Sequence, residues 1–285
     1  MSVEYRRIKV KSALSRSGLP DLDYALNPYV GCAHGCLYCY ARSYVRIVEV
    51  SERWGYLVYV KENLLDVLRQ DIRRLKPGTV GVSTITDPYQ PIEAVEELTR
   101  RAIRSLLKGG FKVSIQTKSP LVLRDLDVLL EYARSVDVGF TIITMDESVA
   151  SVLEPGAPSP KARAEALMRI SRAGIRTWLF YGPVIPGVND RVEHFEEVLR
   201  SLRGGVDLVL IDKLRITPEV YRSLGRALAN PDRVFRLALD RGWWSSTVRS
   251  FDKLCLELGV RCIPSIAEPE GGVRSLKEYS SEASR

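Results

Sequence analysis

Short apolar runs alternate with amphipathic stretches along most of the chain. Runs rich in β-branched and apolar residues predict strands at 24–31, 56–60, 79–85, 111–117, 136–143, 175–182 and 206–212. Apolar residues at helical spacing predict helices at 62–76, 92–110, 120–135, on either side of 154–160, at 190–205 and at 218–229. The strand runs lack clean apolar–polar alternation, which is typical of strands covered on both faces. Strand followed by helix, repeated, predicts a parallel sheet with right-handed crossovers.

The number of repeats limits the architecture of this α/β fold. About six strand–helix units fall short of the eight units of a full TIM barrel. The sequence contains no evident linker, so we expect one folded unit. It would comprise an N-terminal segment (1–23), a core barrel (24–215) and a C-terminal helical extension (216–285).

Polar segments follow several of the predicted strands. They are "TITDPYQPIE" (84–93), "TKSP" (117–120), "TMDES" (144–148) and "GPVIPGVND" (182–190), and a cysteine-rich loop (31–42) follows the first strand. Loops after parallel barrel strands converge on one rim, where active sites of such barrels lie. We therefore expect the chemistry of this protein on that rim.

Composition narrows the class of protein only moderately. Apolar residues make up 45% and charged residues 27% of 285 residues, as in ordinary globular proteins. A net charge of +7 fits an arginine-rich surface or a polyanionic partner such as nucleic acid, and no dense basic run decides between them.

The N-terminus lacks the apolar core of a signal peptide, and no apolar run has membrane-spanning length. Five cysteines, three of them crowded, favour a reducing compartment, so we expect a cytoplasmic protein without membrane partners.

The crowded cysteines are Cys32, Cys36 and Cys39, in a C-x3-C-x2-C spacing. A structural zinc site usually has four ligands, and His34 would have to join from inside the same tight loop. A [4Fe–4S] cluster takes one thiolate per iron, so three cysteines leave one iron open to a substrate or cofactor. Three thiols on one glycine-flanked loop are poorly explained as small buried apolar residues.

This loop resembles the motif of the radical S-adenosylmethionine (SAM) family, in which an aromatic residue, here Tyr38, precedes the third cysteine. The resemblance implies a partial (β/α)6 TIM-like barrel, a [4Fe–4S] cluster whose open iron chelates SAM, and a one-electron reductant such as a ferredoxin or flavodoxin. It further implies that SAM is cleaved to a 5′-deoxyadenosyl radical that abstracts hydrogen from a substrate. Segments across 24–215 are similar to the group related to spore photoproduct lyase, described as DNA-repair-photolyase-like, which favours nucleic acid as the substrate.

The same resemblance implies a set of SAM-pocket residues. They are Tyr38, Thr86, Asp87, Lys118, Thr141, Arg163, Gly182, Pro183 and Val184. Four of them have an ordinary alternative. Lys118 suits a carboxylate but is also a strand-end lysine, Asp87-Pro88 is also a turn signal, Thr141 is also a common strand former, and Arg163 is also typical of an exposed helix position.

The resemblance weakens at Thr84. Spore photoproduct lyase has a hydrogen-donating cysteine at the matching place, and a threonine hydroxyl holds its hydrogen too tightly for that role.

Tyr40 could stack, pack or relay hydrogen, and is the candidate catalytic residue. Cys255 and Cys262 could supply the missing thiol if the C-terminal segment folds over the rim, but we expect them to be buried structural cysteines. Three hypotheses remain: a radical SAM enzyme acting on nucleic acid, a radical SAM maturase acting on a protein or small molecule, and a non-catalytic iron–sulfur or zinc module that binds nucleic acid.

Overall fold

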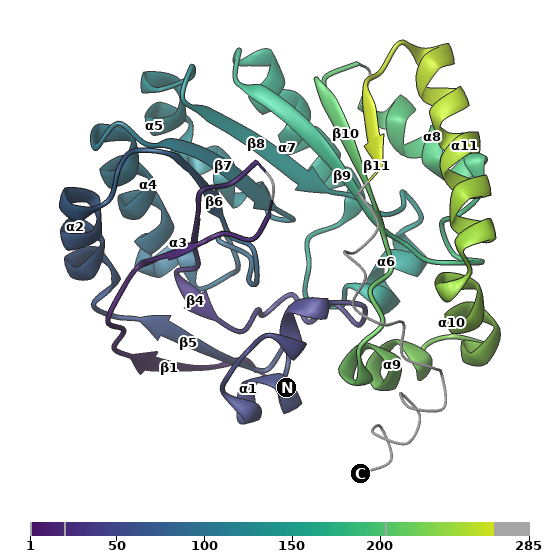
Figure 1. The fold of residues 1–285 in the computed structure, drawn as a ribbon, viewed down its shortest axis with the longest axis horizontal. Coiled ribbons are helices and arrows are strands. Elements are labelled where there is room, and N and C mark those ends of the chain that lie inside the picture. Colours follow the sequence, from purple (N-terminus) through teal and green to yellow (C-terminus); the bar gives the residue numbers. More distant parts are fainter. Residues whose placement is uncertain (1, 20, 203, 265–285) are drawn as a thin grey trace.

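A curved sheet of mostly parallel strands forms the body of the molecule (Figure 1). The computed structural model describes residues 2–19, 21–202 and 204–264. Within these, the strand order is β11-β10-β9-β8-β7-β6-β3-β2, and every neighbouring pair is parallel except β2 with β3. The strands are β2 (Leu14–Arg16), β3 (Tyr24–Leu26), β6 (Thr79–Val82), β7 (Lys112–Thr117), β8 (Val136–Thr141), β9 (Arg176–Val184), β10 (Leu208–Lys213) and β11 (Cys262–Pro264). The consecutive run from β3 to β10 confirms the expected α/β fold with six parallel barrel strands.

A second, smaller sheet lies beside this barrel and corrects two sequence predictions. It has the order β1-β5-β4, formed by β1 (Glu4–Ile8), β5 (Leu57–Lys61) and β4 (Tyr29–Val30). The run 56–60 is therefore a strand, but the prediction that it belongs to the main series is wrong, because it pairs with the N-terminal β1. The predicted first strand divides into β3 of the barrel and β4 of the small sheet.

Helices between the barrel strands cover the outer side of the curved sheet, and others lie beside the small sheet and beyond the ends of the barrel strands (Figure 1). They are α1 (Val48–Glu52), α2 (Leu64–Arg74), α3 (Glu93–Glu96), α4 (Leu98–Lys108), α5 (Leu126–Glu131), α6 (Glu147–Leu153), α7 (Pro160–Arg172), α8 (Val192–Ser201), α9 (Pro218–Gly225), α10 (Pro231–Leu239) and α11 (Arg241–Leu258), with 3-10 helices η1 (Tyr40–Ser43) and η2 (Pro120–Asp125). The predicted helix 92–110 breaks at Glu97, which adopts φ 48°. The predicted helix 120–135 begins as η2 before it becomes α5.

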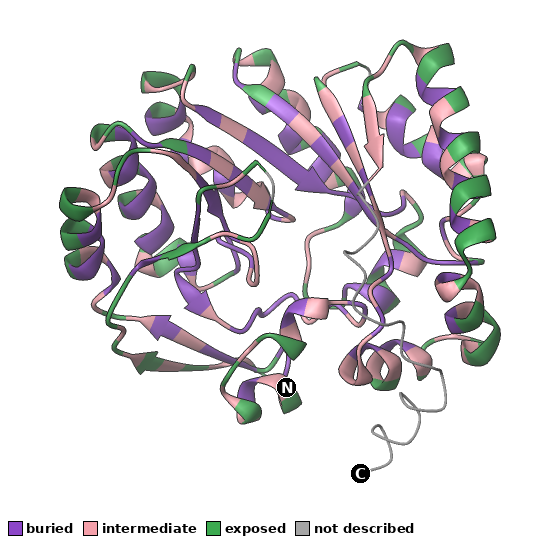
Figure 2. Ribbon diagram, in the orientation of Figure 1, coloured by how far each residue is buried: buried purple, intermediate pink, exposed green. Residues whose placement is uncertain are grey.

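The core lies between the sheet and these helices, and Figure 2 shows the barrel strands largely buried and the outer helix faces exposed. Ile115, Val138 and Leu179 are fully buried on neighbouring strands, and Ile103 and Leu106 of α4 pack in the same cluster. Burial of such a side chain stabilises the fold by roughly 1.5–3 kcal/mol. The packed barrel therefore gives the loops at its rim a firm base.

The C-terminal part contains a disulfide that the sequence did not predict as such. Cys255 of α11 and Cys262 of β11 are joined, with Cα atoms 6.1 Å apart. Both cysteines are structural, as expected, but only Cys255 is buried, since Cys262 is half-buried. The packing of α11 against β11 brings the two thiols within bonding distance. The division into 1–23, 24–215 and 216–285 stays a prediction, and 265–285 lie outside the described residues. No helix in the described part of the chain is both long and apolar enough to span a bilayer.

Candidate functional site

A cavity opens at the carboxyl ends of the barrel strands, as the loop positions predicted. Its walls come from the cysteine loop, the segment after β6, and the ends of β7, β8, β9 and β10. The lining residues include Cys32, His34, Cys36, Tyr38, Cys39, Tyr40, Thr84, Thr86, Asp87, Gln116, Lys118, Thr141, Phe180, Gly182, Pro183, Asp212, Lys213 and Arg215. The chemically distinctive residues of the sequence thus face one space.

The thiols of Cys32, Cys36 and Cys39 are all free and line this cavity. Burial raises the pKa of all three, to about 12 for Cys36. Thiols of this kind release their protons when a metal binds, because the thiolate is the ligand. Among the described residues, no group of three His, Cys, Asp or Glu side chains is arranged to hold a metal ion. A [4Fe–4S] cluster takes one thiolate per iron, so the three thiols of this loop suffice for three of its four irons.

One side of the cysteine loop is held by the segment 84–93. Gln90 accepts a hydrogen bond from the Ala33 N–H (2.9 Å) and donates to the Gly31 carbonyl (3.3 Å). Thr86 Oγ1 donates to the same carbonyl (2.6 Å). Gly31 has φ +89°, and a Cβ there would lie 2.6 Å from the Leu57 carbonyl oxygen, so glycine is required. The hydroxyl of Thr86 therefore fixes the loop, and its expected contact with SAM stays a prediction.

Asp87 links this segment to the end of β7. Its carboxylate accepts hydrogen bonds from the Lys118 N–H (2.8 Å) and the Thr117 hydroxyl (2.7 Å), and lies 3.4 Å from His34 Nδ1. Burial alone would raise the pKa of Asp87, but His34 and these hydrogen bonds lower it to about 2. The ionised carboxylate thus holds together the cysteine loop and the base of Lys118, and direct contact of Asp87 with SAM stays a prediction.

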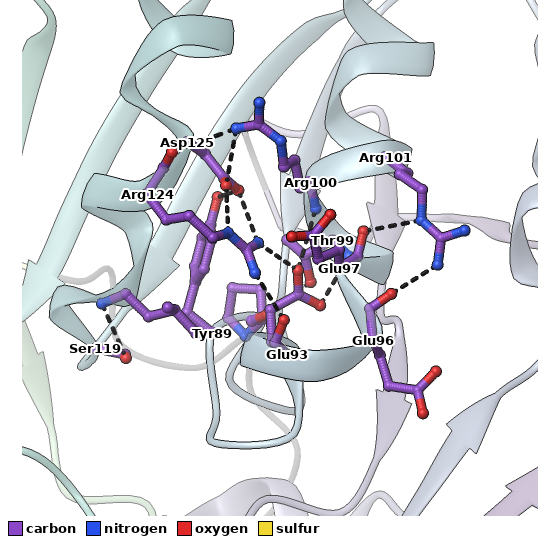
Figure 3. Close-up of polar contacts among 12 residues, drawn as sticks. Tyr89, Glu93, Glu96, Glu97, Thr99, Arg100, Arg101, Ser119, Arg124 and Asp125 are labelled. Carbon is purple, nitrogen blue, oxygen red and sulfur yellow. Dashed lines mark hydrogen bonds and ion pairs between the residues drawn. The ribbon is translucent and has the colours of Figure 1, made fainter.

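A buried ionic network anchors the far end of the segment 84–93 (Figure 3). Arg124 donates to Glu93 (2.8 Å) and to Asp125 (2.7 Å), and Arg100 donates to Asp125 (3.1 Å). Tyr89 donates to Asp125 (3.0 Å). Glu93 and Asp125 are essentially inaccessible, so their charges require these partners. The network fixes α3, α4 and η2 against one another behind the loop.

The segment between α6 and α7 holds the other side of the cysteine loop through its backbone. The Leu37 N–H donates to the Leu153 carbonyl (2.9 Å), and the Gly156 N–H donates to the His34 carbonyl (2.9 Å). A Cβ at Gly156 would lie 2.2 Å from the Ala33 carbonyl oxygen. Glycine at 156 is therefore required for this close approach.

Glu154, in the same segment, is the functional residue that sequence reasoning missed. It is 2% exposed, accepts a hydrogen bond from Tyr38, and pairs with Arg163 (2.6 Å) and with Lys118 (3.9 Å). The Lys118 ammonium also lies 5.6 Å from the centroid of the Tyr38 ring. Burial opposes ionisation of Glu154, but Arg163 and Lys118 lower its pKa overall. The sequence offered no signal for Glu154, because the burial of Arg163, which requires a carboxylate partner, appears only in the folded chain.

The exposed-helix alternative for Arg163 is wrong, because this side chain is 1% exposed. It also donates to the carbonyls of Pro158 (2.8 Å) and Thr141 (3.2 Å). Arg163 does not line the cavity, and the structure places it behind Glu154. Val184 is likewise fully buried outside the lining. Their direct contact with SAM stays a prediction.

The remaining predicted residues face the cavity. Thr141 Oγ1 accepts a hydrogen bond from Gln116 (3.1 Å), and Gly182 and Pro183 of the neighbouring strand β9 line the same cavity. The Tyr40 hydroxyl donates to the Thr84 carbonyl (3.2 Å). Burial raises the pKa of Tyr40 to about 12. Cys255 and Cys262 do not line the cavity and are bonded to each other, so neither supplies the thiol missing at Thr84.

Comparison with known proteins identifies the family. The model of the radical SAM superfamily matches residues 26–241, so the chain belongs to this superfamily. The uncharacterized protein MJ0683 of Methanocaldococcus jannaschii is 36% identical over 188 residues, which are 66% of this chain and 70% of the relative. The uncharacterized protein ORF301 of Acidianus two-tailed virus is 31% identical and covers 78% of this chain and 82% of its own. The radical SAM Nalpha-GlyT isomerase of Pseudomonas phage M6 is 26% identical over 61% of this chain and 36% of its own.

Solved structures support the fold. Spore photoproduct lyase complexed with dinucleoside spore photoproduct superimposes with a TM-score of 0.65 at 18% identity, covering 89% of this chain and 78% of that one. A radical SAM methyltransferase from Sphaerobacter thermophilus gives a TM-score of 0.56 at 18% identity, covering 86% and 66%. The resemblance to the spore photoproduct lyase group is thus confirmed in the fold. As a radical SAM enzyme, the protein uses SAM, an iron–sulfur cluster and a reductant.

Proposed function

We propose that the protein holds a [4Fe–4S] cluster on Cys32, Cys36 and Cys39 and binds SAM beside it. The observation that carries this proposal is the meeting of three free thiols, Lys118 and Tyr38 in one rim cavity. The cluster, once loaded and reduced by a ferredoxin- or flavodoxin-like partner, supplies the electron that cleaves SAM to a 5′-deoxyadenosyl radical, which takes hydrogen from the substrate.

Residues of this chain divide the work of holding SAM. The Lys118 ammonium faces the cavity and suits the SAM carboxylate, a charge-assisted contact. Glu154 orients both Lys118 and Tyr38, and the buried Arg163 compensates the charge of Glu154. Thr86, Asp87 and Thr141 line the amino-acid end of the proposed pocket, while Gly182, Pro183 and Val184 supply the strand edge for adenine.

Nucleic acid is the proposed substrate, and the reaction is repair or base modification. Support comes from the likeness of the fold to a lyase bound to a dinucleoside photoproduct and from the net charge of +7. Thr84 lines the cavity where that lyase group carries a cysteine, so a reaction that needs a thiol at this place is not proposed.

Deuterium transfer tests the proposal. The reconstituted, reduced enzyme would be incubated with SAM and with DNA or RNA deuterated in the bases and sugars. We expect deuterium in the 5′-deoxyadenosine that forms. Formation of unlabelled 5′-deoxyadenosine with every nucleic acid, and transfer from a protein or small molecule, would move the proposal to the maturase alternative. A colourless protein that carries zinc after anaerobic reconstitution would support the non-catalytic alternative.

A further inference from the structure

Two segments distant in sequence form one surface beside the mouth of the cavity. η1 directly follows Cys39, and α9 follows β10. Ser43 Oγ hydrogen-bonds Thr217 Oγ1 (2.6 Å) and donates to Glu219 Oε2 (2.5 Å). These bonds fix the end of η1 against the start of α9. We call Arg42, Tyr44, Arg222 and Arg226 the η1–α9 surface.

Aromatic rings lead from the cavity to this surface. The Tyr40 ring lines the cavity, and the Arg215 guanidinium lies 4.8 Å from its centroid. The Tyr44 ring meets Tyr40 edge to face, with centroids 5.7 Å apart. Tyr44 is 60% exposed, although it is a large aromatic residue. An open ring next to a cavity-lining ring offers a stacking platform for a planar heterocycle.

The two segments that form this surface carry three arginines. Arg222 and Arg226 are exposed on and just after α9, and Arg42 is half-buried on η1. The guanidinium of Arg42 donates to the Ser51 carbonyl (3.2 Å), which holds this side chain against α1. The acid among them, Glu219, already accepts a hydrogen bond from Ser43 and lies 3.9 Å from Arg222. The cluster therefore carries excess positive charge, which suits phosphates.

We propose that the η1–α9 surface binds single-stranded nucleic acid and guides one nucleotide into the cavity. The exposed Arg222 and Arg226 would bind phosphates of the strand, the half-buried Arg42 would add positive charge to the surface, and one base would stack on Tyr44. The next base would pass Tyr40 and Arg215 into the cavity, as expected of enzymes that act on an unstacked base. An acidic peptide would match the charge but would supply no base for Tyr44. This inference rests on the proposed function, because it supplies the substrate of the same cavity.

Binding of fluorescein-labelled oligonucleotides of about 12 bases tests this surface, since single-strand sites span several to about 16 nucleotides. DNA and RNA form separate arms, and anisotropy is measured over a series of salt concentrations without SAM or reductant. Tyr44→Ala is expected to weaken binding about fivefold or more, and Tyr44→Phe to keep it within twofold, because the phenyl ring still stacks. The pair Arg222→Gln and Arg226→Gln is expected to reduce the slope of log K against log salt by about 1.4.

Arg172→Gln is the matched control, because Arg172 is an exposed arginine that ends α7 at the opposite rim of the barrel. It should leave affinity and slope unchanged. Three results would each overturn the proposal for this surface. They are equal salt slopes for Arg172→Gln and the arginine pair, wild-type affinity in Tyr44→Ala, and displacement of the oligonucleotide by polyglutamate of equal charge. If deuterium is transferred from nucleic acid but the variants bind the oligonucleotide as the wild type does, only the proposal for the η1–α9 surface is refuted. If the variants weaken binding as expected but no deuterium is transferred from nucleic acid, only the proposed function is refuted.

Discussion

Replacing Glu154 by glutamine removes one charge from a buried ion pair and leaves its partner in place. Arg163 is 1% exposed and lies 2.6 Å from Glu154, so its guanidinium would lose a desolvated counter-ion. Breaking a buried pair in this way costs about 3–5 kcal/mol of unfolding free energy. The carbonyls of Pro158 and Thr141 still accept hydrogen bonds from Arg163, which favours the lower end, about 3 kcal/mol.

Urea unfolding with an unchanged m-value measures this loss. The double variant Glu154→Gln, Arg163→Met is the control, because it leaves neither charge unpaired. It should recover much of the stability lost in the single variant. A Glu154→Gln protein as stable as the wild type would refute the buried pair. If the double variant loses as much unfolding free energy as the two single variants lose together, the two residues are not energetically coupled, which would refute the ion pair.

Three further changes test other contacts. Lys118→Ala should raise the dissociation constant of SAM roughly tenfold or more without loss of iron, since a charge-assisted contact contributes about 1.5–3 kcal/mol; unchanged SAM affinity, by equilibrium dialysis, would place Lys118 outside the site. Gly156→Ala should lower iron content after reconstitution in a folded protein, because its Cβ would lie 2.2 Å from the Ala33 carbonyl oxygen; full iron loading would show that the cysteine loop accommodates the change. Cys255→Ser opens a disulfide that spans 7 positions to Cys262 and should lower the unfolding free energy by about 2.5 kcal/mol with iron unchanged; a loss of iron would tie this disulfide to the cavity.

Repeated local patterns made the barrel predictable. Parallel strands buried on both faces appear as apolar runs, and each is followed by a helix with a clear apolar face. The small sheet was not predictable in the same way, because β5 is apolar like a barrel strand and pairs with β1 only through long-range contacts. The break at Glu97 is a second example, since a residue at φ 48° interrupts an otherwise continuous helical pattern.

Motif spacing identified the three thiols that we propose hold the cluster, because three close cysteines have few other uses. The supporting contacts lay beyond sequence reasoning. Gln90 hydrogen-bonds the backbone of the cysteine loop at Ala33, 57 positions away in the chain, and Glu154 accepts a hydrogen bond from Tyr38, 116 positions away. Neither partner is specified by a local pattern. Thr86 and Asp87 were found as polar rim residues, but only the folded chain shows the hydrogen bond from Thr86 to the Gly31 carbonyl and the approach of Asp87 to His34.

Reductive cleavage of SAM tests the central claim most directly. The wild-type chain and Cys36→Ala would be reconstituted anaerobically with iron and sulfide, reduced with dithionite in the presence of SAM, and analysed for 5′-deoxyadenosine by mass spectrometry. The wild type should carry an oxygen-sensitive [4Fe–4S] signal and release 5′-deoxyadenosine, and Cys36→Ala should show neither. A wild-type protein without 5′-deoxyadenosine, or a variant with full cluster content and cleavage, would contradict the assignment of the three cysteines.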